Sequence, residues 1–151
     1  MRTAYRTLAA LIALEVVIQA MVMVFAISGL AIWIDEGGVA DAAAFEGEAP
    51  FPEFIGLIAH GINGMMVIPA LALLLLISSF FAKVPQGVKW AAIVLLLVVT
   101  QVALGLFGHE ASIFGALHGL NAFLLLGAAG YTAHRARDRV AAVPARERQL
   151  V

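Results

Sequence analysis

The sequence predicts an all-α membrane protein, an antiparallel bundle of four transmembrane helices with both termini in the cytoplasm. Of its 151 residues, 63% are hydrophobic and 13% are charged, and the mean hydropathy is +1.00. Soluble domains are typically about 45–50% apolar and about 25% charged. Four apolar segments each supply the roughly 20 helical residues that span a bilayer core of about 30 Å. The length suits one compact domain.

The first span covers about residues 7–34. A cleaved signal peptide is the alternative, because the small residues of segment 39–42 resemble a cleavage site. The apolar stretch, however, is much longer than the 7–15 residues of a signal-peptide core. We therefore expect a retained helix.

The other three spans cover about residues 54–81, 88–107 and 111–133. Pro69 is expected to kink the second span, because proline lacks the N–H that an inner helical turn needs. Together the spans define a transmembrane domain at 1–134, with an acidic external loop at 35–53 and a basic cytoplasmic tail at 135–151.

The charges of the connections predict the orientation. All nine basic residues lie before the first span, beside the turn between the second and third, or after the fourth. The other two connections hold only acidic charges, from Asp35 to Glu53 and at Glu110. By the positive-inside rule both termini are cytoplasmic and the acidic loop is external. We expect the chain in a bacterial cytoplasmic membrane, with the lipid bilayer as its first partner.

The composition also limits the chemistry. The chain has no cysteine, which excludes disulfides, thiolate metal sites, iron–sulfur clusters and covalently attached haem. Basic residues are few and the aromatic residues lie in apolar runs, so nucleic-acid binding is not expected. Any metal must therefore bind to histidine, methionine or oxygen ligands.

One motif, His-Gly-x-Asn, occurs twice, starting at His60 and at His118. Each copy lies near the start of a span. A weaker match, Val-Val-x-Gln, links residues 16–19 of the first span with 98–101 of the third. The two matches suggest two tandem helical hairpins related by an axis along the membrane normal.

The two motif histidines are predicted to lie at the same depth. His60 follows Glu53 by seven residues and His118 follows Glu110 by eight. At about 1.5 Å per residue, both lie about 10–12 Å from the external ends of helices that run in the same direction. Ionisable residues inside a membrane indicate a functional site. We expect the pair to be the axial ligands of the iron of one haem b.

Other residues are candidates for contacts with that haem. Gly61 and Gly119 follow the histidines and would let a flat ring approach the helix. Asn63 and Asn121 share a helix face with each histidine, being three residues on. Gln101 lies at the same level in the third span. For the three amides, a hydrogen bond between helices is the favoured role over a cofactor contact.

Two alternatives remain for the histidines. A metal site without haem would need three or four ligands, and only His109 is a plausible third. The histidines could also simply bond across helices in a protein without a cofactor. Elsewhere, Glu15 and Gln19 share a face of the first helix, and a paired, proton-binding or quinone-binding role is open for Glu15.

The paired histidines on the second and fourth spans make the chain resemble one four-helix half of the haem A synthase family. It also looks like a family of short four-helix bacterial membrane proteins of unassigned function. The first resemblance implies a haem between His60 and His118 near the external side. The chain departs from that family where Gly61 and Gly119 follow the histidines, and because the nearest acidic residue before His60 is Glu53.

The predicted function is therefore electron transfer through a b-type haem held by two histidines. A cofactor-free accessory or assembly subunit of a respiratory complex is the alternative, and a haem-modifying oxidoreductase, dependent on Glu53, is a further one. Whether the chain is an enzyme is left open. A respiratory complex, a quinone or a second copy of the chain are the partners considered.

Overall fold

The computed structural model describes residues 1–137, and this part of the chain is helical with no strand. The predicted all-α fold is confirmed. The elements in chain order are α1 (Arg2–Asp35), the short η1 (Ala43–Phe45) and η2 (Pro52–Phe54), α2 (Ile55–Ile62), η3 (Asn63–Val67), α3 (Ile68–Ser79), α4 (Gly87–Phe107) and α5 (Ser112–Arg135). Most of the predicted tail 135–151 lies outside the described residues.

Four helical stretches in the described chain are long and apolar enough to cross a membrane. They are Arg2–Asp35, Pro52–Ser79, Gly87–Phe107 and Ser112–Arg135. The largest difference from the predicted bounds is at the first, where the helix begins at Arg2 rather than near residue 7. Hydropathy marks the apolar part of a helix, whereas Arg2 and Arg6 are compatible with helical backbone and extend it.

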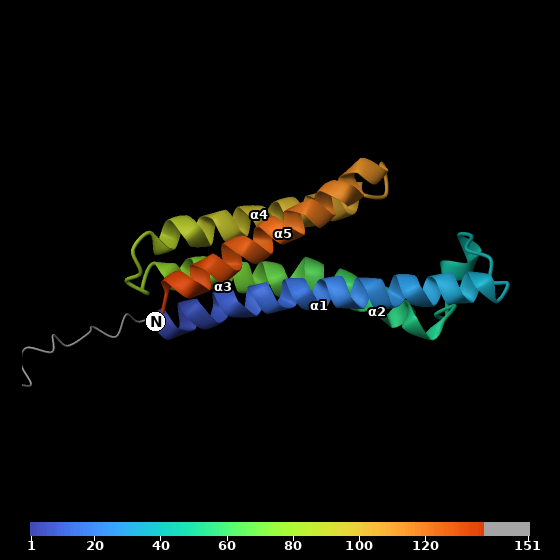
Figure 1. The fold of residues 1–151 in the computed structure, drawn as a ribbon, viewed down its shortest axis with the longest axis horizontal. Coiled ribbons are helices and arrows are strands. Elements are labelled where there is room, and N and C mark those ends of the chain that lie inside the picture. Colours follow the sequence, from blue (N-terminus) through green and yellow to red (C-terminus); the bar gives the residue numbers. More distant parts are fainter. Residues whose placement is uncertain (138–151) are drawn as a thin grey trace, which may run out of the picture.

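The helices form a four-membered bundle (Figure 1). Helix α1 packs against α3 and α5, and α4 packs against the same two, so α1 lies diagonal to α4 and α3 lies diagonal to α5. The first hairpin contains α1 and α3, and the second contains α4 and α5. Each diagonal pair therefore joins corresponding helices of the two hairpins. The arrangement agrees with the tandem hairpins that the repeated motifs suggest.

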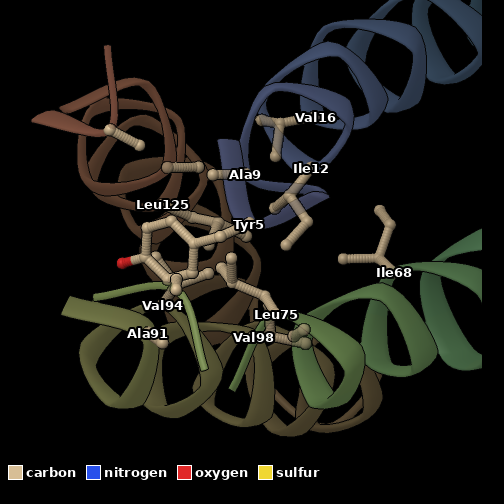
Figure 2. Close-up of a cluster of buried hydrophobic side chains, with 14 of the residues drawn as sticks. Tyr5, Ala9, Ile12, Val16, Ile68, Leu75, Ala91, Val94, Val98 and Leu125 are labelled. Carbon is tan, nitrogen blue, oxygen red and sulfur yellow. The ribbon is translucent and has the colours of Figure 1, made fainter. Parts of the chain in front are cut away.

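We name the two ends of the bundle by what they contain. The terminal end holds Met1, the turn 80–86 and the end of α5, and the loop end holds segment 36–54 and the turn 108–111. The apolar core occupies the terminal half (Figure 2). Its fully buried members include Ile12, Leu75 and Leu125 from three helices. Tyr5 is also buried, and its hydroxyl donates a hydrogen bond to the carbonyl of Gly87 at 2.9 Å.

At the loop end the two hairpins separate. Helix α2 packs on α1 and η2, and within residues 1–137 its contacts with α4 and α5 are marginal at most. The ends of α1 and α2 accordingly diverge from those of α4 and α5 in Figure 1. The buried apolar cluster does not extend into this half: its last members on α1 and α4 are Val16 and Val98. This is the half that carries both His-Gly-x-Asn motifs.

The second span contains a π-helical segment, η3, between α2 and α3. The sequence predicts a kink at Pro69, and the irregularity lies just before it. Proline has no N–H for the carbonyl four residues earlier, and its ring collides with that carbonyl in a regular helix. A wider π turn relieves both problems, and such turns are frequent at functional sites. Helix α5, the corresponding element of the second hairpin, is a regular α-helix.

Candidate functional site

The bundle brings His60 of α2 and His118 of α5 together. Their ring centroids are 6.0 Å apart, and the ring planes are inclined by 54°. Both rings are partly buried, just beyond the apolar core on its loop-end side. The two histidines therefore lie at the same level of the bundle, as the residue count predicts.

Both imidazoles are oriented in the same way by backbone carbonyls. Nδ1 of His60 lies 3.3 Å from the carbonyl oxygen of Gln19, and Nδ1 of His118 lies 3.0 Å from that of Gln101. A carbonyl can only accept, so each Nδ1 must carry the proton and donate it. In the neutral ring, Nε2 then keeps its lone pair, which is the form that binds a metal ion. Metal-binding histidines are commonly held by such a bond from the other nitrogen.

These two contacts explain the weak Val-Val-x-Gln match. Gln19 and Gln101 are the last residues of the two copies, and each offers its backbone carbonyl to the histidine of its own hairpin. The longer loop of the first hairpin changes the spacing along the chain but not the contact. The two hairpins thus repeat one structural unit, a glutamine carbonyl on the first helix and a histidine on the second.

The motif asparagines bond between helices, which is the role favoured from the sequence. Asn121 donates to the carbonyl of Leu97 at 2.9 Å and to Oε1 of Gln101 at 2.6 Å. Asn63 donates to Oε2 of Glu15 at 2.7 Å. These bonds fix the rotation of each histidine helix on its partner helix. They occupy the amide nitrogens, so the asparagines act on the site by positioning the histidines.

The glycines near the histidines have different surroundings. A Cβ atom added at Gly61 or at Gly119 would meet nothing within 4 Å. At Gly105 of α4, which the sequence does not single out, a Cβ would lie 3.1 Å from Cε1 and 3.2 Å from Nδ1 of His118. Gly105 therefore makes room for the His118 ring. Its spacing of four residues from Gln101, one turn along the same helix face, is the only sequence signal for it.

The remaining candidates lie apart from this pair. His109 and His134 are exposed. No group of three or more histidine, aspartate or glutamate side chains that could hold a metal ion occurs in residues 1–137. Glu53 lies over Gly29 of α1, where an added Cβ would collide with it. The two histidines are therefore the only ligands that the described part of the chain gathers at this level.

The distance between the histidines suits a shared metal ion. A metal–imidazole bond of about 2 Å on either side of one ion places the ring centroids about 6 Å apart. Two rings on one axis can be rotated freely about it, so an inclination of 54° is compatible with this geometry. Aromatic rings in direct contact also have centroids about 4.5–7 Å apart, and the separation alone does not exclude simple packing.

Comparison with protein-family models, with curated proteins and with solved structures finds no match to this chain.

Proposed function

We propose that the chain binds one b-type haem between His60 and His118 and serves in electron transfer. The observation that carries the proposal is the matched orientation of the two rings. Each Nδ1 is held by a glutamine carbonyl, so that Nε2 is the nitrogen with the free lone pair in the neutral ring, and the ring centroids are 6.0 Å apart. Each of the two hairpins thus places a histidine at the same level of the bundle, with the same ring nitrogen bonded to a backbone carbonyl.

The number of ligands favours haem over a free metal ion. A structural zinc ion has four protein ligands, and catalytic zinc keeps three. Residues 1–137 gather only two ligands here. A haem supplies the four equatorial nitrogens itself and needs from the protein only one or two axial groups. The donor set of this chain therefore fits haem and is too small for zinc.

The packing of the bundle also supports the proposal. The apolar core stops at Val16 and Val98, and the hairpins diverge on the side where the histidines lie. When bound, such a haem would supply a one-electron redox centre. With both axial positions taken by imidazole, no position is left for oxygen, which suits electron transfer better than oxygen activation.

For the membrane, we propose the orientation that the charges predict. Within residues 1–137 the basic residues lie toward the terminal end, and the connections at the loop end carry only acidic charges. With the terminal end in the cytoplasm, the histidine pair lies in the external leaflet of a bacterial cytoplasmic membrane. The haem would then exchange electrons with a partner close to the external surface.

A cofactor-free accessory subunit of a respiratory complex is the competing function. It is favoured by the contacts of the motifs, since Asn63, Asn121 and both Nδ1 atoms already have partners inside the bundle. Haem modification has less support, because the only acidic residue close before His60, Glu53, lies over Gly29 of α1.

Titration of the purified chain with haemin in detergent separates these functions. We expect a shifted, sharpened Soret band that saturates at one haem per chain, because one chain supplies both ligands. A spectrum identical to that of haemin in detergent alone, at every ratio, would contradict the proposal and favour the accessory subunit. Saturation at one haem per two chains would contradict the intrachain pair.

A further inference from the structure

The side chain of Gln19 is buried without a hydrogen-bond partner. Only 8% of Gln19 is exposed, and neither Nε2 nor Oε1 of its amide has a partner. Buried polar groups in folded proteins are nearly always paired, and an unpaired one calls for an explanation such as an absent ligand. The backbone carbonyl of Gln19 holds His60, but its amide is free for another role.

The second hairpin shows what a fully paired arrangement looks like. There Gln101, the counterpart of Gln19, accepts a bond from Asn121 through its side chain. In the first hairpin Asn63 turns instead to Glu15, one helical turn before Gln19. The residue corresponding to Glu15 in the second hairpin is Leu97. Because Glu15 stands where the second hairpin has Leu97, Asn63 bonds to Glu15, and the Gln19 amide stays unpaired.

The unpaired amide points toward the irregular part of the second span. A Cβ added at Gly64 would lie 3.8 Å from Oε1 of Gln19. Gly64 and Asn63 both belong to the π-helical segment η3. The first hairpin therefore differs from its counterpart in three linked features: an intramembrane carboxyl group, an unpaired amide and a widened helical turn. They adjoin His60, which bonds to the carbonyl of Gln19 and precedes Asn63 by three residues.

We propose that Gln19 and Glu15, with Asn63 as a positioning residue, bind the head group of a lipid-soluble quinone. The ligand must enter from the bilayer, since the cluster lies within two apolar spans. It must also carry oxygen atoms that match both groups. The Gln19 amide N–H donates to a quinone carbonyl, and the partly buried Glu15 carboxyl group accepts from the hydroxyl of the reduced form. Quinone and quinol provide these atoms on a flat ring.

This site stands on residues other than the two histidines, and the inference goes beyond the proposed haem. Its binding can be measured whether or not haem is present. The edge of the haem itself is the other group that could meet the Gln19 amide. In that case the wild-type chain would not bind quinone, and substitution of Gln19 would change the affinity for haem.

The test is calorimetric titration of the purified full chain in detergent with two probes, a short-chain ubiquinone analogue and a short-chain menaquinone analogue. Glu15→Leu installs the residue found at the corresponding position 97, so this variant is expected to fold. Gln19→Leu removes the unpaired amide. Ser78→Ala is the control, since it removes a polar group from the second span whose hydroxyl bonds only within its own helix, to the carbonyl of Leu75. Circular dichroism checks the helical content of each variant.

We expect the wild-type chain to bind one of the two probes, and Glu15→Leu and Gln19→Leu to bind it at least about tenfold more weakly. Ser78→Ala is expected to bind as the wild type does. Three outcomes would overturn the proposal: no binding of either probe by the wild type, unchanged binding by both Glu15→Leu and Gln19→Leu, or an equal loss in Ser78→Ala. Parallel titration with haemin shows separately whether the haem site is intact.

Discussion

Replacing either His60 or His118 by alanine is expected to abolish haem binding. Loss of a residue that only supports a metal ligand typically lowers metal affinity by about 10–100-fold, and loss of the ligand itself should cost more. In the proposed site each ring would supply one of the two axial bonds, and each Nδ1 is already bonded to a glutamine carbonyl. No third histidine lies near enough to substitute, since His109 and His134 are exposed and apart from the pair. The measurement is the haem content of the purified variants, followed by their Soret bands after haemin is added.

The control for these variants is the double substitution of His109 and His134 by alanine. It removes as many histidines as the loss of the whole pair, and we expect it to leave the Soret band unchanged. Added imidazole should restore part of the band in each single variant, because alanine leaves space for a free ligand. Wild-type haem content in both single variants would show that His60 and His118 are not the ligands.

Gly105→Val is expected to have the second largest effect on haem binding. The added Cβ would lie 3.1 Å from Cε1 of His118, closer than an ordinary van der Waals contact, and the valine methyl groups would crowd the ring further. Overpacking of this kind typically costs about 1–3 kcal/mol. The ring must tilt or α5 must move, and either change displaces Nε2 of His118 from the place where it would bind the proposed haem iron. We expect an affinity for haemin lower by roughly tenfold, since about 1.4 kcal/mol corresponds to that factor.

Gly127→Val provides the comparison, because a Cβ at Gly127 of α5 meets nothing within 4 Å. It makes the same change in helix propensity at an exposed position, and we expect haem binding to be retained. Both variants are compared by haemin titration and by thermal unfolding in detergent. A Gly105→Val protein that binds haem as tightly as Gly127→Val would argue against a His118 ring held close to α4.

The features that depend on composition and periodicity could be predicted from the sequence. Apolar length alone predicts the four helices, because a span must satisfy its backbone within itself. The matched depth of His60 and His118 follows from counting residues to Glu53 and Glu110 at a fixed rise per residue. Even the weak Val-Val-x-Gln match corresponds to a real contact in each hairpin.

The features that depend on backbone geometry could not be predicted in the same way. Every residue has a carbonyl, so nothing in the sequence marks those of Gln19 and Gln101 as the partners of the histidines. The steric role of Gly105 requires the approach of α5 to α4. Pro69 predicts a disturbance of the helix, but not that a π turn would accommodate it over residues 63–67. The unpaired amide of Gln19 depends on which neighbours surround it in the folded bundle.

The most direct test of the central claim is the reduced-minus-oxidised absorption spectrum of the purified protein, recorded with and without carbon monoxide. A haem held by His60 and His118 predicts sharp α and Soret bands of a six-coordinate b-type centre that carbon monoxide leaves unchanged, because both axial positions are occupied. A protein that retains no haem once haemin has been added and the unbound haemin removed, or bands that shift with carbon monoxide, would contradict a haem held between the two histidines.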